Sequence, residues 1–379
     1  MSESVKSGFI YSDEFAQYSY GLHHPMRPIR LKLTHDLLQA YGLFERPDIL
    51  KLTPQSANES EVALFHREDY IAVLREIDRG VVPPNAYVYG LGPGDNPMFP
   101  SVYQYSLLVT GATLQAARLV KSGRVPVAFN IGGGLHHAMP DRASGFCYFN
   151  DPVIAIKELV NQGQRVVYLD VDVHHGDGVQ AGFYDTDQVM TISLHEDGQF
   201  LFPGTGFVEA MGRGAGYGYS VNAPLYPGTD DETYLWAFDE SVPPLVEAFK
   251  PDLIVTQLGV DTFVADPLAH LRLTTHGFCQ ILQHIKSFAI PWIALGGGGY
   301  HIANVARAWT LAYAVMNDIE LPDEIPPECV ESLQQHGLQG TRLRDPEPTQ
   351  LIHQHVRQFA ERQVKALQQK IFPLHGLSA

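Results

Sequence analysis

The chain has 379 residues, 45% of them hydrophobic and 18% charged, and its 26 basic and 42 acidic residues give a formal net charge of −16. This composition is typical of a folded globular protein and excludes a chain that is disordered over most of its length. The acidic balance argues against a nucleic-acid-binding surface and allows cationic substrates.

The first residues, MSESVKSGFIYSDEF, carry acidic groups and lack an apolar leader segment, and no stretch approaches the roughly 18 apolar residues of a membrane-spanning helix. The three cysteines are too few and too far apart for a disulfide framework. We therefore expect a cytoplasmic protein with no membrane partner, and the sequence leaves its oligomeric state open.

Apolar runs of strand length, most of them continuous, alternate with segments of helical periodicity. In chain order they predict a helix at 101–120, a strand at 126–131, a helix at 152–162, strands at 165–173, 188–195 and 217–225, a helix at 230–249, a strand at 252–260, a helix at 274–288, a strand at 290–297 and a helix at 302–316. Pro243–Pro244 should break or kink the helix at 230–249. This alternation indicates an α/β fold with a mainly parallel central sheet flanked by helices on both faces.

Residues 80–100 are too rich in glycine and proline for regular structure and predict a long loop. From about residue 320 the sequence predicts a connector that leads to a polar C-terminal helix near 349–370. No internal repeat and no shift in composition marks a boundary, so we expect a single domain over residues 1–379.

Polar side chains follow four of the predicted strands. Ligands of parallel α/β sheets bind beyond the carboxyl ends of the strands, so these positions are the candidates for chemistry. They are His136 and His137 after 126–131, Asp170, Asp172, His174 and Asp177 in the segment LDVDVHHGDG, Asp261 after 252–260, and Tyr300 after the glycines that end 290–297. We expect the four groups to converge on one rim of the sheet.

Asp172 and His174 lie two residues apart, so both point to the same face if the strand persists. With Asp261 from another strand they can form a site with three protein ligands and an open position, as catalytic metal sites do. Two carboxylates and one imidazole favour Zn²⁺, with Fe²⁺ as an alternative. A lone Asp-x-His is more often a strand-end cap. A second acid at the end of an apolar run, Asp261, changes this balance, because burying a charged carboxylate costs free energy unless it is paired or binds a metal, and this favours the metal site.

The adjacent His136 and His137 suit proton transfer, because one imidazole can take a proton from an activated water while the other positions water or substrate. Each needs a carboxylate on its other ring nitrogen, and Asp170 and Asp177 remain for that purpose. A His-His pair alone is not diagnostic, since His23–His24 forms another, to which we assign no direct catalytic role.

Tyr300 follows four glycines, Gly296–Gly299, whose conformational freedom permits a tight turn near the metal ligands. A phenol there can stabilise an oxyanion formed from a carbonyl. The alternative, a phosphate-binding loop, is weak because GGGGYH lacks the glycine spacing of nucleotide-binding motifs. Phe146 and Phe202 can supply apolar walls for an extended aliphatic chain, although aromatic residues are more often part of the core.

Seven segments together resemble the metal-dependent histone deacetylase family, with its arginase-like α/β fold: GGGLHHAMPDRASGFCYFND, YLDVDVHHGDGVQ, SLH, FPGTG, QLGVD, DPLAHLRLT and GGGGY. The resemblance runs from about residue 8 to 316, leaves an extension at about 320–379, and is closest to bacterial members related to class I deacetylases and to acetoin-utilisation proteins. It implies a zinc hydrolase that removes acetyl or other acyl groups from the ε-amine of lysine.

The resemblance implies a role for each matching residue. Asp172, His174 and Asp261 would bind zinc. His136 and His137 would be the catalytic pair, with His137 as general base and acid and with Asp170 and Asp177 as the partners of the two rings. Tyr300 would polarise the amide carbonyl. Gly145, Phe146 and Phe202 would line the tunnel, Asp95 would hold the substrate backbone at the rim, and Arg30 would line an internal acetate channel. Two structural K⁺ sites would use Asp170, Asp172, His174, Ser193 and Leu194, and Phe183, Thr186, Val189 and Tyr219.

The substrate stays open between acylated lysine in a peptide or protein and a small acylated amine, such as an acetylpolyamine or an acylated metabolite. The active centre would be the same in both cases, so only tunnel and rim can discriminate. A non-catalytic binding protein on the same fold is disfavoured, because no ligand position and no tyrosine position is altered.

Overall fold

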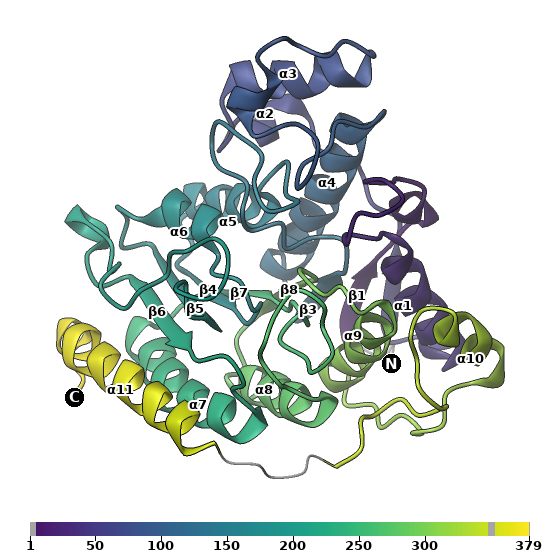
Figure 1. The fold of residues 1–379 in the computed structure, drawn as a ribbon. Coiled ribbons are helices and arrows are strands. Elements are labelled where there is room, and N and C mark those ends of the chain that lie inside the picture. Colours follow the sequence, from purple (N-terminus) through teal and green to yellow (C-terminus); the bar gives the residue numbers. More distant parts are fainter. Residues whose placement is uncertain (1–4, 348–352, 379) are drawn as a thin grey trace.

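A computed structural model describes residues 5–347 and 353–378 (Figure 1). Its centre is one sheet of eight strands in the order β2-β1-β3-β8-β7-β4-β5-β6. Every neighbouring pair is parallel. The strands are β1 (Ser7–Ile10), β2 (Ile49–Leu52), β3 (Val127–Asn130), β4 (Val166–Asp170), β5 (Val189–Glu196), β6 (Ser220–Leu225), β7 (Leu253–Gln257) and β8 (Trp292–Leu295). The predicted α/β class with a parallel central sheet is thus confirmed.

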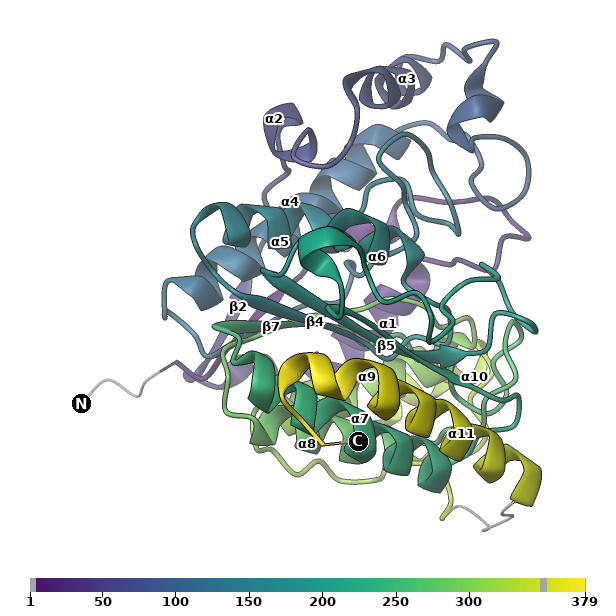
Figure 2. The same cartoon turned by 90° about the vertical axis from the view of Figure 1, so that its left-hand side faces the viewer.

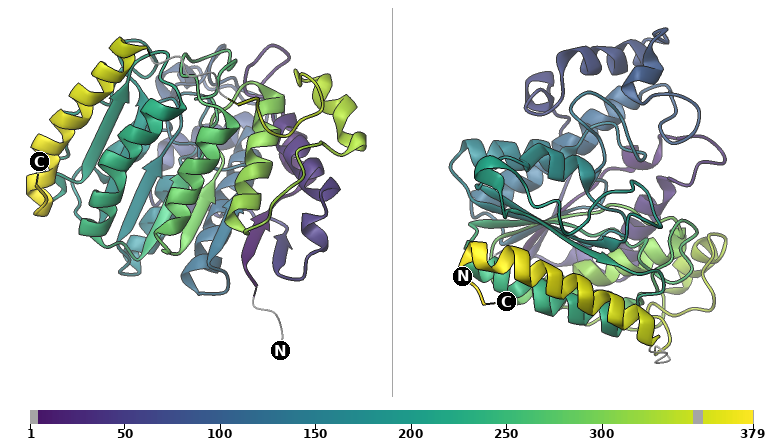
Figure 3. Two further views of the ribbon diagram at one scale, coloured as in Figure 1. Left: turned by 90° about the horizontal axis from the view of Figure 1, so that it is seen from below. Right: turned by 60° about the vertical axis from the view of Figure 1, so that its left-hand side comes forward.

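Helices cover both faces of this sheet, which is seen edge-on in Figure 2. One face carries α2 (Glu59–Val62), α3 (Glu68–Asp78), α4 (Val102–Lys121), α5 (Asp151–Asn161) and α6 (Asp177–Phe183). The other carries α1 (Ile29–Ala40), α7 (Asp231–Phe249), α8 (Thr275–Ser287), α9 (Ile302–Met316), α10 (Pro327–Gln334) and α11 (Gln354–Ile371), and Figure 3 shows α11, α7, α8 and α9 side by side. Because both faces are covered, every strand except the edge strand β2 is buried at each residue.

Short 3-10 turns complete the described elements: η1 (Asp13–Ala16), η2 (Leu43–Glu45), η3 (Ala86–Tyr89), η4 (Gly214–Gly216) and η5 (Phe372–His375). Among the described residues, no helix is long and apolar enough to cross a bilayer. The predicted loop at 80–100 contains only η3 as regular structure.

The six predicted strands and five predicted helices are present, with ends that differ by a few residues. β1 and β2 were not predicted, because four residues are too few to show a periodicity. Of the expected break or kink at Pro243–Pro244, the break is wrong, since α7 continues through both prolines, and a kink stays a prediction. The carbonyl of Glu240, which Pro244 cannot satisfy, accepts a hydrogen bond from Gln368 Nε2 of α11 at 3.2 Å.

The segment after residue 320 is more structured than the predicted connector, because it contains α10. The C-terminal helix is present as α11, although residues 349–352 of its predicted span lie outside the described residues. α11 is also less uniformly polar than expected. Its buried face packs against α7 and β6 and consists of Val356, Ala360, Val364, Leu367 and Ile371. The helix therefore covers the outer edge of the sheet, which β6 forms.

Candidate functional site

The four strands whose ends carry the predicted polar groups are neighbours in the sheet, in the order β3-β8-β7-β4. Their carboxyl ends lie along one edge because all four are parallel. The segments that follow them meet there, and together they form the candidate site. The sequence indicated which strand ends matter, while their adjacency depends on long-range pairing.

The candidate metal ligands on the β4 side do not lie on a strand, contrary to the prediction. β4 ends at Asp170, and Asp172 and His174 belong to the loop that leads to α6. Carboxylates shape this loop instead: the backbone N–H of Asp172 donates to Asp170 Oδ1 at 3.1 Å, and that of His174 donates to Asp172 Oδ1 at 2.9 Å. The backbone N–H of Val173 donates to Asp261 Oδ1 at 2.9 Å, which ties the loop to the end of β7.

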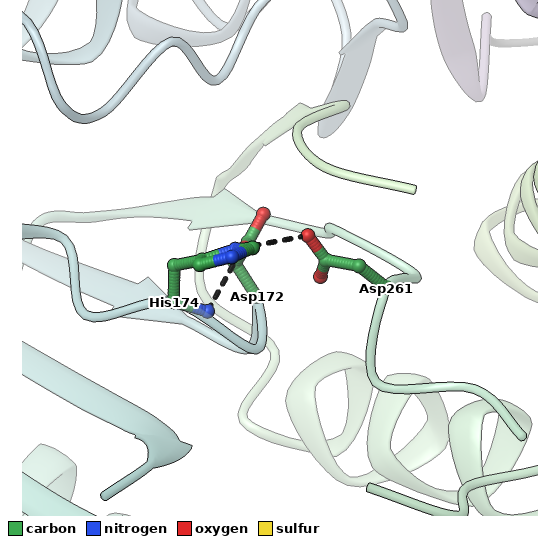
Figure 4. A group of neighbouring side chains, drawn as sticks. All are labelled: Asp172, His174 and Asp261. Carbon is green, nitrogen blue, oxygen red and sulfur yellow. Dashed lines mark hydrogen bonds and ion pairs between the residues drawn. The ribbon is translucent and has the colours of Figure 1, made fainter. Parts of the chain in front are cut away.

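Asp172, His174 and Asp261 form a compact, buried cluster (Figure 4). His174 Nδ1 lies 3.0 Å from Asp172 Oδ1 and 3.2 Å from Asp261 Oδ2. One ligand atom from each residue lies within 4.8 Å of the others. This spacing suits three ligands of a single cation.

The charges in the cluster are unbalanced without a cation. Burial alone would lower the pKa of His174, but the carboxylates of Asp172 and Asp261 beside the ring raise it to about 10. Burial and the charge of Asp172 raise the pKa of Asp261 to about 7. Asp261 Oδ2 is buried and lacks a hydrogen-bond partner among the described residues. Two facing carboxylates, one of them with an oxygen that lacks a hydrogen bond, and an imidazole fit a divalent cation such as Zn²⁺.

Outer partners orient the Asp172 carboxylate. Gln257 Nε2 and the backbone N–H of Gly298 donate to its Oδ2 at 2.6 and 2.8 Å, which leaves Oδ1 directed at His174. A side chain at Gly298 would overlap Asp261 Oδ2, so the close approach of this backbone requires glycine. Gln257, the last residue of β7, begins the segment QLGVD, and the sequence indicated no role for it, because its partners Asp172 and Gly134 lie far away along the chain.

His136 and His137 stand beside the cluster and are each paired with a carboxylate. His136 Nδ1 lies 2.7 Å from Asp170 Oδ2, and His137 Nδ1 lies 2.7 Å from Asp177 Oδ1. Burial would lower the pKa of His136, but Asp170 and Asp172 raise it to about 9. Burial and the neighbouring His136 lower the pKa of His137 to about 4. The pair therefore combines one charged and one neutral imidazole at neutral pH.

The backbone that carries these histidines is held by two buried residues at the start of α5. Asn150 Nδ2 donates to the carbonyls of His136 and Ala138 at 3.1 and 3.0 Å. Asp151 accepts from the backbone N–H groups of Gly134 and Leu135 at 3.0 and 2.9 Å. This Asn-Asp dipeptide ends the segment GGGLHHAMPDRASGFCYFND, and the sequence indicated no role for it. We name these contacts, made by Asn150 and Asp151, the loop clamp.

Tyr300 reaches the cluster from the glycine segment after β8, and its ring centroid lies 6.5 Å from that of His174. Its backbone N–H donates to Asp266 Oδ2 at 2.8 Å, which is a second contact missed in the sequence. Arg30 lies buried beneath the same segment and donates from Nη1 to the carbonyl of Gly299 at 2.9 Å. Burial raises the pKa of the Tyr300 phenol well above its usual value, so the phenol stays protonated.

Phe146 and Phe202 contact different members of the site. The Phe202 ring lies 5.0 Å from that of His137 and remains 44% exposed. The Phe146 ring lies 5.6 Å from that of Tyr300. A side chain at Gly145 would overlap the His137 ring, so this turn brings the backbone against the histidine pair. The role of the two phenyl rings as walls for an aliphatic chain stays a prediction.

Asp95 lies exposed in the loop before α4, and its backbone carbonyl is 3.2 Å from His24 Nε2. The His24 ring also packs edge-on against Phe146, with 4.6 Å between centroids. His24 therefore belongs to the surroundings of the site. The sequence predicted no direct catalytic role for His24 and gave no sign of these contacts, because its partners lie far away along the chain.

The residues predicted for K⁺ fall into two groups. Asp170 and Ser193 are register partners on β4 and β5, and the Leu194 carbonyl accepts from Tyr234 Oη at 3.2 Å. The second group lies at the other end of β5, between α6 and the start of β6. It comprises Phe183, Thr186, Val189 and Tyr219. Both K⁺ sites stay predictions.

Comparison with known proteins places the chain in a family. A family model described as "Histone deacetylase domain" matches residues 24–316. The chain belongs to the histone deacetylase family. Members of this family are metal-dependent hydrolases, typically with zinc, that remove acyl groups from amides. The resemblance inferred from the sequence motifs is thus confirmed.

Relatives of this histone deacetylase family member include human and bacterial proteins. Histone deacetylase 1 of Homo sapiens is 42% identical over 324 residues, which cover 84% of this chain and 66% of that protein, just under two thirds of its length. Acetoin utilization protein AcuC of Bacillus subtilis is 42% identical over 338 residues, which cover 87% of this chain and 86% of that protein.

A solved structure extends the likeness of this family member to the whole fold. The crystal structure of an HDAC homologue from Aquifex aeolicus matches with a TM-score of 0.87 and 35% identity, and covers 96% of this chain and 100% of that one. An HDAC homologue complexed with SAHA matches with the same TM-score and identity.

Proposed function

We propose that the protein is a zinc-dependent amidohydrolase that removes acetyl or other acyl groups from the ε-amine of lysine in peptides or proteins. One observation carries the proposal: a buried Asp-His-Asp cluster lies beside two histidines that each hold a carboxylate. Membership of the deacetylase family supports the class of reaction.

Asp172, His174 and Asp261 would hold the cation, for which Zn²⁺ is the first choice and Fe²⁺ an alternative. When bound, the cation would polarise the amide carbonyl and make water a stronger acid. Gln257 keeps Asp172 Oδ1 directed toward His174, as outer partners of metal ligands do.

His137 is the general base and acid of the proposed reaction. It is neutral at pH 7, and Asp177 on Nδ1 directs its Nε2 into the site. This nitrogen takes the proton of the attacking water and returns it to the leaving amine. His136, held by Asp170, has its Nε2 3.0 Å from that nitrogen and positions the reacting groups.

Tyr300 donates its phenolic hydrogen to the oxyanion that forms from the amide carbonyl. Its pKa, raised by burial, keeps that hydrogen in place. The bond from its backbone N–H to Asp266 fixes the segment from which the ring extends.

The walls and the rim suit a lysine side chain. Phe146, Phe202 and the turn at Gly145 line a path for the aliphatic chain, and Asp95 accepts hydrogen bonds from the substrate backbone at the rim. Arg30 offers a buried guanidinium to the carboxylate product beneath the glycine segment. The two predicted K⁺ sites would hold structural cations near β5.

The decisive test measures amine release by the zinc-loaded protein from an acetyl-lysine peptide and from an acetylpolyamine at equal concentration, with Tyr300→Phe as control. We expect preference for the peptide, lost in the control. Preference for the polyamine would keep the chemistry and move the substrate to small amines. Absence of release from both would reject the proposed reaction.

A further inference from the structure

We propose that His24 is a positioning residue that fixes the rim loop carrying Asp95 and thereby sets the affinity for peptide substrates. The proposal rests on the proposed function, in which Asp95 holds the substrate backbone. It gives His24 a role in binding and none in the chemical step.

The hydrogen bonds of His24 define its tautomer. The backbone N–H of Met26 lies 3.0 Å from His24 Nδ1, and a backbone N–H can only donate, so Nδ1 accepts. The single proton of the neutral ring is then on Nε2, which donates to the Asp95 carbonyl at 3.2 Å. One imidazole thus joins the loop before α1 to the loop before α4.

The ring is held between aromatic neighbours. It stacks on Tyr20 with 4.9 Å between centroids and meets Phe146 edge-on at 4.6 Å. Tyr20 Oη donates to the Phe146 carbonyl at 3.2 Å, so this packing is itself anchored. His24 therefore links the wall formed by Phe146 to the backbone of Asp95.

The Asp95 loop has a second anchor on its other side. Asn96 is buried, and its Nδ2 donates to the Cys147 carbonyl at 3.2 Å. Asp95 itself is exposed, and the bond from His24 Nε2 holds its backbone carbonyl in place. An Asp95 carboxylate on a fixed backbone can meet a peptide without first being ordered, which favours binding.

The adjacent His23 is a matched control. It is exposed, and none of the side-chain hydrogen bonds found among residues 5–347 and 353–378 involves its ring. His24→Phe keeps a flat ring between Tyr20 and Phe146 while it removes both polar atoms. His23→Phe makes the same chemical change one residue away, where the contacts are absent.

The kinetic test uses two substrates with the same acylated amine, an acetyl-lysine peptide and N-butylacetamide, which lacks a peptide backbone. His24→Phe should raise KM for the peptide about three- to tenfold, the effect of one or two lost hydrogen bonds, with kcat within twofold. The efficiency toward N-butylacetamide should not change, and His23→Phe should match the wild type. Asp95→Asn should give the same split, and the double variant should lose no more than the larger single effect.

Equal losses on both substrates would overturn the proposal, because His24 would then act on the common tunnel. An unchanged KM for the peptide would overturn it as well. Hydrogen exchange separates this result from a failure of the proposed function: His24→Phe should speed exchange of the amides at 91–98, and His23→Phe should not. If neither substrate reacts, the exchange rates still decide. Unchanged exchange at 91–98 in His24→Phe rejects the role of His24, and faster exchange shows that His24 fixes this loop.

Discussion

His136 Nε2 lies 3.0 Å from His137 Nε2, while the Nδ1 atom of each ring turns to a different carboxylate. Two imidazoles in this arrangement share one proton between their facing nitrogens, because two N–H groups cannot point at each other. His136 is close to both Asp170 and Asp172 and keeps that proton, whereas His137 has Asp177 alone. The asymmetry makes His137 the acceptor in the pair.

A low pKa of His137 predicts how activity depends on pH. Its pKa of about 4 lies below the usual value, so the base form persists as the pH falls, and a bound cation would shift the pKa in the same direction. We expect kcat/KM to stay level from pH 8 to pH 6.5 and to show no decline centred at the ordinary histidine value of about 6.5. A pH profile with an acid limb at 6.5 or above would contradict the assignment.

Tyr300→Phe should lower kcat by about 10²- to 10³-fold, the usual loss when one donor to an oxyanion is removed. KM and metal content should stay near wild type, because the contact that fixes the segment is the backbone N–H of Tyr300 to Asp266. Steady-state kinetics and elemental analysis check this. Unchanged turnover would remove Tyr300 from the mechanism.

Asp261→Asn should reduce bound metal, because it replaces a buried carboxylate whose Oδ2 has no other partner among the described residues. Asp266→Asn is the matched control, since it changes a nearby buried aspartate that contacts Tyr300. The control should keep its metal and lose part of its kcat. Metal titration of the two variants measures the difference in bound metal. Full metal occupancy in Asp261→Asn would exclude Asp261 as a ligand.

The candidate site was largely predictable because its residues follow continuous apolar strands, whose carboxyl ends form the binding edge of a parallel sheet. The reason given for pairing Asp172 with His174 was wrong, since β4 ends at Asp170 and backbone-to-carboxylate bonds bring them together. Side chains two residues apart share a face only within a strand, and the strand ends before Asp172.

Other features depended on contacts between distant segments, which leave no local pattern. The continuity of α7 involves Gln368, more than 100 residues beyond Pro244. The contact of His24 with Asp95 joins residues 71 positions apart. Asn150 bonds to a loop 12 to 14 residues earlier, and an asparagine before a helix reads simply as a cap.

The loop clamp can be tested with Asn150→Ser. Asn150 Oδ1 caps α5 by accepting from the Val153 N–H at 3.1 Å, a task that serine also performs. Serine cannot reach the carbonyls of His136 and Ala138, which would stay buried without this donor. We expect the free energy of unfolding to fall by about 1–3 kcal/mol. We also expect kcat to fall about tenfold or more with little change in KM, because displaced catalytic groups lose rate more than binding.

Asn58→Ser is the control for Asn150→Ser, because Asn58 is an exposed N-cap of α2 that accepts from the Glu61 N–H at 3.0 Å. This variant should keep its kcat and change stability by less than about 1 kcal/mol, since serine and asparagine cap helices almost equally well. Chemical denaturation and steady-state kinetics of both variants give the comparison. If Asn150→Ser loses stability but keeps full kcat, the loop clamp serves folding alone, and the position of the histidine pair is set by Asp170 and Asp177 through their side-chain bonds.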